Sequence, residues 1–151
     1  MYKIITDHHP SQDDIKTVRT GIIDFNDLAL GYKSNTFSVF LKDPNDTIQG
    51  GILAWMDTES IYIEILWVDA KLRGQGYGSK ILRTAEDEGR KNGCIYCTLD
   101  TFGFQAEEFY LKNGYYQIGE IKNYIRDYSR IFLRKNLHSE NESVNKTIQK
   151  A

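Results

Sequence analysis

The sequence predicts an α/β fold of the mixed α+β kind, in which a central mixed β-sheet carries helices on both faces. Three observations lead to this fold class. A helix-like segment comes first, three strand-like segments joined by tight turns follow it, and the remainder alternates between helix and strand. That order of elements implies a mixed sheet that is covered on its two sides.

The first half of the chain is expected to contain one helix and three strands. Ser11 is the expected N-cap of a helix that runs to about Gly31, because the apolar residues between them recur near helical spacing. The Asp-Pro-Asn-Asp segment at 43–46 is expected to turn, since proline fixes φ and Asp and Asn bond their own backbone. A second turn is expected at 57–60. Strands are expected at residues 36–42, 48–56 and 61–68.

The second half is expected to alternate between helix and strand. Residues 77–92 form a predicted helix with Ile81, Leu82 and Ala85 on one face, and it stops at Gly93, a residue type common just after a helix end. The remaining predicted elements are a strand at 94–101, a short helix at 106–113 that Gly114 ends, and two closing strands at 115–121 and 129–133.

Length and composition predict one globular domain with a short tail. A chain of 151 residues can bury a core without disulfides or metals, and we expect that domain to span residues 1–137. Residues 138–151 hold one valine, one isoleucine and no aromatic residue, beside charges of both signs. They are expected to form a disordered tail.

Charge and hydropathy argue against several classes of partner. The formal net charge is −2 and no basic run occurs, which gives no support to nucleic-acid binding. No apolar stretch approaches the length of a membrane span, and the first residues have no signal-peptide core. We therefore expect a cytoplasmic protein with neither nucleic acid nor membrane as a partner.

Cys94 and Cys97 have the C-x-x-C spacing of many metal and redox sites. They stand on a predicted strand, where side chains three positions apart point to opposite faces, so a shared metal or disulfide is disfavoured. Two buried, reduced cysteines are expected instead. His8, His9 and His138 lie near the chain ends and form no cluster, and no metal site is expected.

A glycine-rich turn, Arg73-Gly74-Gln75-Gly76-Tyr77-Gly78, joins the strand at 61–68 to the helix that begins at Tyr77. Backbone N–H groups from about Gly74 to Ser79 have no partner at the positive end of the helix dipole, so the turn is a ready anion site with phosphate as its usual occupant. Arg73 adds positive charge. The glycines allow a ligand to approach the backbone closely.

The turn fits neither common nucleotide motif. The dinucleotide fingerprint G-x-G-x-x-G needs a glycine where this chain has Ser79, and the P-loop needs Gly-Lys-Ser/Thr where the order here is Gly78-Ser79-Lys80. The pattern that remains is R-x-x-G-x-G, which alone fits a plain glycine-rich loop as well.

A second segment lies one helix and one strand further along, at residues 104–115, with the sequence Phe-Gln-Ala-Glu-Glu-Phe-Tyr-Leu-Lys-Asn-Gly-Tyr. In this order and spacing the two segments resemble the GNAT family of N-acetyltransferases, which has R-x-x-G-x-G in its acyl-CoA pyrophosphate loop and an alanine and a tyrosine four apart on a later helix. The resemblance covers roughly residues 11–135. It implies a GNAT-like acyl-CoA N-acyltransferase fold, with acetyl-CoA as co-substrate and no metal.

The resemblance also assigns site residues. The end of the strand at 61–68 would offer backbone groups to the pantetheine and the acetyl oxygen, and Tyr110 would protonate the leaving thiolate. Because Ala106 and Phe109 would pack inward beside it, the alternative is a core tyrosine with a hydrogen-bonded hydroxyl. The predicted acyl-CoA residues are Leu66, Trp67, Val68, Arg73, Gly74, Gln75, Gly76, Tyr77, Gly78 and Ser79.

Glu64 is the candidate general base. A central strand covered on both sides has no solvated face, so a carboxylate there needs a partner or a purpose. An amine with a pKa of ~10 is protonated at neutral pH, and a carboxylate can attract and deprotonate it, directly or through water. An edge-exposed or salt-bridged glutamate is the alternative. Strict alternation places Ile61, Ile63, Ile65 and Trp67 on one face of the strand and Tyr62, Glu64, Leu66 and Val68 on the other.

The expected acceptor is the primary amine of a small, cationic molecule that attacks directly in a ternary complex, because an acidic and aromatic pocket suits a cation. A protein or peptide N-acetyltransferase and a non-catalytic acyl-CoA sensor are the alternatives. Dimers are common among GNAT relatives, so the resemblance also allows a homodimer. The acidic candidates are Asp24, Asp27, Asp57, Glu59, Glu64 and Asp100, and the aromatic ones are Trp55, Tyr62, Trp67, Phe102 and Phe104.

Overall fold

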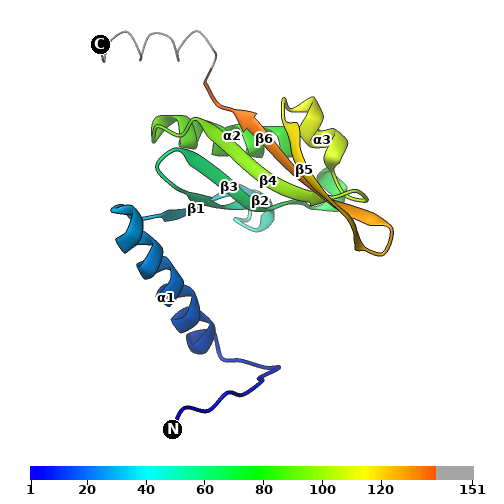
Figure 1. The fold of residues 1–151 in the computed structure, drawn as a ribbon. Coiled ribbons are helices and arrows are strands. Elements are labelled where there is room, and N and C mark those ends of the chain that lie inside the picture. The colour runs from blue at the N-terminus through cyan, green and yellow to red at the C-terminus, as the bar shows by residue number, and fades with distance from the viewer. Residues whose placement is uncertain (139–151) are drawn as a thin grey trace, which may run out of the picture. The chain divides into compact units, whose positions relative to one another are not determined.

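A computed structural model describes residues 1–138 of the chain (Figure 1). The chain divides into two compact units, Met1–Ser34 and a second that begins at Asn35, and each is described by itself. The predicted single domain over residues 1–137 stays a prediction. Except for His138, the tail predicted at 138–151 lies outside the described residues.

The first unit contains one helix, α1 (Gln12–Leu30). Ser11 has extended backbone angles and its Oγ accepts a hydrogen bond of 3.1 Å from the N–H of Asp14, which satisfies one of the unpaired donors of the first turn. Gly31 adopts the left-handed conformation with φ 72° and donates to the carbonyl of Asp27. Both predicted ends of this helix are confirmed.

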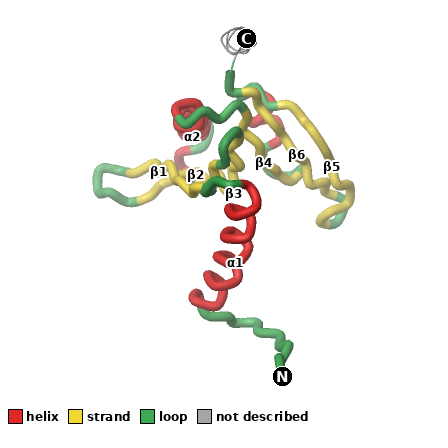
Figure 2. The backbone as a smooth tube through the Cα atoms, turned by 60° about the vertical axis from the view of Figure 1, so that its left-hand side comes forward, coloured by secondary structure: helices red, strands yellow, loops and turns green. Residues whose placement is uncertain are grey.

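The second unit is built on a six-stranded sheet with the order β1-β2-β3-β4-β6-β5 (Figure 2). β3 and β4 are parallel, and the other neighbours are antiparallel, so the predicted mixed sheet is confirmed. The strands are β1 (Asn35–Lys42), β2 (Ile48–Met56), β3 (Ser60–Val68), β4 (Tyr96–Phe102), β5 (Tyr116–Ile125) and β6 (Tyr128–Asn136).

Two helices and one 3₁₀ turn complete this unit: η1 (Ala70–Leu72), α2 (Tyr77–Lys91) and α3 (Glu107–Lys112). The buried face of α2 holds the predicted Ile81, Leu82 and Ala85, and it packs closely on β3. A Cβ atom at Gly89 would lie 2.2 Å from Ile61 Cδ1, so only glycine allows this approach. Gly93 has φ 85° and follows the helix as predicted.

The hairpin of β5 and β6 is longer than the sequence predicts. Its strands reach Ile125 and begin again at Tyr128, whereas the apolar pattern ends at Ile121 and resumes at Ser129. The added residues of β5 are exposed, and positive φ occurs at Asn123 within them and at Arg126 in the turn. Backbone pairing extends the ladder here without any burial pattern that a sequence could show.

Cys94 and Cys97 are both buried and free, as predicted, although β4 begins only at Tyr96. The hydroxyl of Tyr115 lies 3.0 Å from Cys97 Sγ and 3.1 Å from Glu86 Oε1, and Lys135 Nζ donates to Glu86 Oε2 at 2.7 Å. Burial raises the pKa of the Cys97 thiol to about 12. This thiol is therefore protonated in a satisfied polar network of the core.

Within residues 1–138 no group of three or more His, Cys, Asp or Glu side chains is placed to hold a metal ion. No helix in the same range is both long enough and apolar enough to cross a membrane.

Candidate active site

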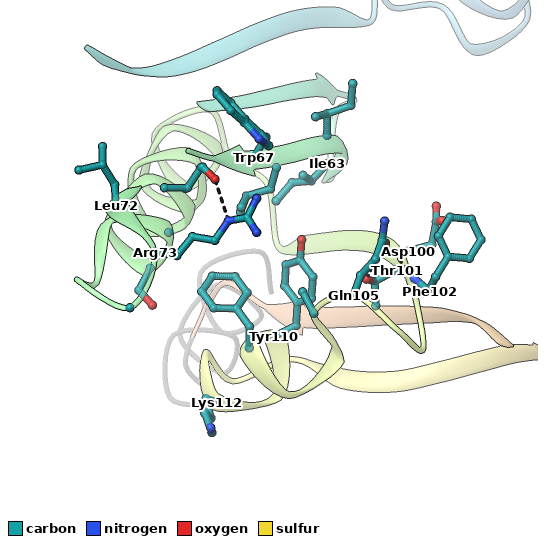
Figure 3. A pocket seen from close by; sticks show the side chains of 18 of the residues that line it. Ile63, Trp67, Leu72, Arg73, Asp100, Thr101, Phe102, Gln105, Tyr110 and Lys112 are labelled. Atoms are coloured by element: carbon teal, nitrogen blue, oxygen red, sulfur yellow. Dashed lines mark hydrogen bonds between the residues drawn. The ribbon is translucent and has the colours of Figure 1, made fainter. Parts of the chain in front are cut away.

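A cleft of about 1040 Å³ opens where β3 and β4 separate (Figure 3). The two strands pair from Ser60 opposite Tyr96 to Ile63 opposite Leu99, and beyond that point β3 pairs only with β2. The second half of β3 forms one wall of the cleft, the glycine turn forms one end, and the end of β4 with α3 forms the other wall.

A β-bulge at Glu64 shapes the β3 wall. Ile63 pairs with Ala54 and Ile65 pairs with Leu53, so Glu64 is an extra residue without a partner on β2. The bulge changes which side chains share a face, and the predicted strict alternation is wrong beyond Ile63. Val68 is buried and Leu66 is partly buried on the side of Ile61 and Ile63, whereas Ile65 and Trp67 are exposed.

The glycine turn presents free backbone donors to one end of the cleft. Gly74 and Gly76 have φ of 73° and 82°, a conformation that favours glycine. α2 begins directly after Gly76, no side chain caps it, and its first backbone bond runs from Lys80 to the Gly76 carbonyl. The N–H groups just before Lys80 therefore point out of the helix end without an intrahelical acceptor.

Arg73 is held in place beside this turn. Its Nε donates to the carbonyl of Val68 at 3.0 Å, which leaves the outer guanidinium nitrogens for a ligand (Figure 3). Of the predicted acyl-CoA residues, two do not line the cleft: Gln75, whose amide donates to the carbonyl of Lys71, and Tyr77. Those that line it are Leu66, Trp67, Val68, Arg73, Gly74, Gly76, Gly78 and Ser79.

Tyr110 projects from α3 into the cleft (Figure 3). Its ring is 6% exposed and packs edge-to-face on Phe109 and Tyr115, with centroids 5.1 and 5.7 Å away. Its hydroxyl takes part in none of the hydrogen bonds found among residues 1–138, unlike a core tyrosine that is satisfied by protein groups. Burial raises its pKa to about 12, so the hydroxyl keeps its proton near neutral pH.

Two carboxylates line the cleft in different electrostatic states. Glu64 is exposed, and its Oε2 accepts one hydrogen bond of 3.2 Å from Trp55 Nε1. Asp100 is 13% exposed and accepts from Arg130 Nε at 2.7 Å and from the hydroxyl of Tyr62. Burial opposes the charge of Asp100, but these hydrogen bonds outweigh it and lower its pKa. Glu64 has no ion pair among the described residues, so its charge is available to a ligand.

Some of the other predicted acceptor residues line the cleft and the others do not. Trp67, Phe102 and Phe104 line the cleft, whereas Trp55 and Tyr62 do not line it and donate hydrogen bonds to Glu64 and Asp100. The remaining acidic candidates do not line it: Asp24, Asp27, Asp57 and Glu59.

Sequence reasoning missed Arg130, which pairs with Asp100, and Gln105, which lines the cleft. Arg130 comes from the hairpin and lies 30 positions from Asp100 in the chain, so no local pattern connects them. Gln105 lines the cleft just before α3. The sequence places Gln105 directly before the helix predicted at 106–113. The direction of its side-chain amide depends on tertiary contacts, so the sequence does not indicate it.

Comparison with known proteins identifies relatives of this fold and site. The sequence model described as "Acetyltransferase (GNAT) family" matches residues 1–115. Acetyltransferase Atu2258 from Agrobacterium fabrum is 27% identical over 107 residues, which are 70% of this chain and 78% of the relative. Blasticidin-S acetyltransferase from Streptomyces morookaense is 36% identical over 78 residues, 51% of this chain and 57% of that protein.

Solved structures share the architecture. A crystal structure described as an acetyltransferase from Agrobacterium tumefaciens has a TM-score of 0.79 and 25% identity, and the match covers 90% of this chain and 99% of that one. A structure described as a streptothricin acetyltransferase from Bacillus anthracis, in complex with acetyl coenzyme A, has a TM-score of 0.61 and 22% identity over 68% of this chain and 62% of that one. Both have the same fold as this chain.

Proposed function

The chain belongs to the acetyltransferase (GNAT) family and is an acetyl-CoA-dependent acetyltransferase, and on that premise we propose that its acceptor is the primary amine of a small cationic molecule. The amine attacks the thioester directly while both substrates are bound. One observation carries this proposal: a single cleft joins the glycine turn, the hydroxyl of Tyr110 and the uncompensated carboxylate of Glu64.

The glycine turn supplies the phosphate end of the acetyl-CoA site. The N–H groups that precede Lys80 and the outer nitrogens of Arg73 can donate to the pyrophosphate, and no Cβ at Gly76 stands in the way. Each charge-assisted hydrogen bond contributes about 1.5–3 kcal/mol, so a few of them suffice for micromolar affinity. The backbone of Leu66 to Val68 then directs the acyl end toward Tyr110.

The other end of the cleft favours a cation. Glu64 offers an unpaired negative charge, and Phe102 and Phe104 offer aromatic surface. Blasticidin-S acetyltransferase carries a small molecule in its name, which supports a small acceptor for this chain as well.

Glu64 and Tyr110 can account for every proton that moves during acetyl transfer. An ammonium group gives one proton to Glu64, directly or through water, and the free amine attacks the thioester carbonyl. The C–N bond forms and the C–S bond breaks, and the thiolate takes the proton of the Tyr110 hydroxyl. The second proton on the new amide nitrogen then restores Tyr110.

The experiment is a measurement of thiol release from acetyl-CoA with a panel of small amines and short peptides. We expect turnover with cationic small amines at kcat/KM values well above those for peptides. Turnover confined to peptides would establish the protein N-acetyltransferase alternative. Tight acetyl-CoA binding by calorimetry without turnover across the panel would establish the sensor.

A further inference from the structure

The side-chain amide of Gln105 has a fixed orientation. The atom that receives the backbone N–H of Phe102 at 3.1 Å must be the amide oxygen, because an N–H group only donates. The same oxygen lies 3.2 Å from Thr101 Oγ1. Two donors on one oxygen determine which way the amide faces, so the NH₂ group must point away from Thr101 and Phe102.

The loop that carries Gln105 is itself anchored. The N–H of Gln105 donates to the carbonyl of Phe102 at 2.8 Å, and the N–H of Gly103 donates to the carbonyl of Ser129 on β6 at 3.0 Å. Such support on two sides holds a site residue more precisely than an unsupported loop does.

The amide nitrogen of Gln105 offers two donors to the cleft. Gln105 lines the cleft, and it lies on the side of Tyr110 that faces Asp100 and Phe102, away from Arg73 (Figure 3). No hydrogen bond of this nitrogen is found among the described residues. Asp100 is already engaged by Arg130 and Tyr62.

The surroundings indicate what these donors bind. Phe102 and Phe104 stack in parallel with centroids 5.5 Å apart, and Phe104 packs against Tyr128 at 4.9 Å, so the donors lie beside an apolar wall. A donor next to apolar surface gains by bonding a ligand atom and loses if left unpaired. Because the unpaired carboxylate of Glu64 repels an anion in this cleft, the matching ligand atom is a neutral oxygen.

We propose that Gln105 determines acceptor specificity, by donating from its side-chain amide to a neutral carbonyl or hydroxyl oxygen of the acceptor amine. The enzyme then prefers amines that carry such an oxygen over hydrocarbon amines of the same shape. This inference rests on the proposed function, since it names a chemical feature of the same acceptor.

Isosteric probe pairs test the preference. β-Alaninamide and glycinamide each carry a carbonyl, and isoamylamine and isobutylamine have the same branched shapes without one. The measured quantity is the ratio of kcat/KM for each amide to that for its hydrocarbon partner. Comparing this ratio between protein variants cancels the different basicities of the amines.

Gln105→Glu is the informative variant, because it keeps an oxygen for Phe102 and Thr101 and replaces the NH₂ donor with a second oxygen that only accepts, at the cost of one added negative charge. We expect the ratio to fall by about tenfold, the effect of one lost hydrogen bond. Gln117→Glu makes the same charge change at an exposed position of β5 and should leave the ratio unchanged. An unchanged ratio in a folded Gln105→Glu protein overturns the proposal. So does a loss of acetyl-CoA affinity with the ratio intact, because Gln105 would then bind the co-substrate.

A second measurement does not depend on turnover. The side-chain amide resonances of Gln105, assigned by their absence in Gln105→Glu, should shift when β-alaninamide is added to the CoA-bound protein and stay in place with isoamylamine. Resonances that ignore both probes overturn the proposal. A selective shift in a protein that acetylates no amine supports the binding site and instead overturns the proposed catalytic function.

Discussion

One end of the cleft is formed mainly by backbone groups, and the other is formed by side chains. The phosphate end consists of backbone N–H groups, two glycines with positive φ and one arginine anchored to Val68. The acceptor end consists of side chains from β3, β4 and the loop before α3, with Arg130 of the hairpin bonded to Asp100, and these meet only in the folded protein. In the proposed function the first end binds a group common to every acyl-CoA, whereas the second can change from protein to protein by substitution.

The acceptor end contains a second contrast, between Glu64 and Asp100. Asp100 is neutralised by Arg130 and bonded by Tyr62, and Glu64 has only a neutral indole as its partner. A carboxylate already paired cannot also attract a substrate cation strongly. In the proposed reaction the charge that can act on the amine is therefore that of the exposed Glu64. Substitutions in both ends of the cleft and at both carboxylates test these roles.

The largest effect is expected at Glu64. Glu64→Gln keeps the size and the hydrogen bond from Trp55 but removes the charge and the base. We expect kcat/KM for the amine to fall by about 10³-fold, within the range of general acid–base catalysis. The acid limb of the pH–rate profile should change as well. Calorimetry should show acetyl-CoA affinity within about twofold of the parent.

Glu59→Gln provides the matched control for Glu64. It removes an exposed acid just before β3, outside the cleft, and steady-state rates should not change. If Glu64→Gln keeps the parental rate and pH profile, the exposed glutamate is only part of the surface.

Tyr110→Phe should lower kcat by about 10²-fold, at the low end for acid catalysis because a thiolate leaves tolerably unaided. The ring packing on Phe109 and Tyr115 is preserved, so acetyl-CoA binding should persist. With its pKa raised to about 12, the parental hydroxyl stays protonated from pH ~6 to ~10, and the loss should be constant over that range. A variant that turns over at the parental rate would reduce Tyr110 to a packing residue.

Gly76→Val tests the backbone end of the cleft. The side chain would enter the open space beside the turn at a φ of 82°, and we expect acetyl-CoA affinity to fall by at least about tenfold in calorimetry. Gly93→Val places the same side chain at a φ of 85°, also in open space, but at the far end of α2. Both variants should lose stability, because a β-branched residue is strained at positive φ. Gly93→Val should nevertheless keep the parental acetyl-CoA affinity. Equal affinities in the two variants would remove the turn from the acetyl-CoA site.

The two ends of the cleft also differ in how well the sequence predicts them. The glycine turn and the bounds of α2 come from local rules, which read a few consecutive residues. The bulge at Glu64 exists only through the register of β3 with β2, so alternation predicted the wrong faces after Ile63. Similarly, Gln105 is oriented by the N–H of Phe102 and Asp100 by Arg130, contacts that no spacing announces.

The smallest effect is expected at Asp100, and it is one of stability. Asp100→Asn leaves Tyr62 an oxygen to bond but leaves Arg130 without its ion pair. The pair is partly solvated, so we expect a cost of about 1 kcal/mol, a melting temperature lower by about 3 °C at pH 7. Turnover of a simple amine should change far less than in Glu64→Gln.

The pH dependence identifies the ion pair as the cause. The pKa of Asp100 is lowered in the folded protein, so its charge stabilises the fold above the unfolded pKa of ~3.9 and ceases to do so as the pH falls through the folded pKa. The difference in melting temperature between parent and Asp100→Asn should thus be constant near neutrality and become smaller as the pH falls below ~3.9. Glu108→Gln breaks an exposed pair with Lys112 and should show no difference at any pH. A gap between parent and Asp100→Asn that does not become smaller as the pH falls below ~3.9 would assign the loss to altered packing, and Asp100 would no longer contrast with Glu64 by its charge.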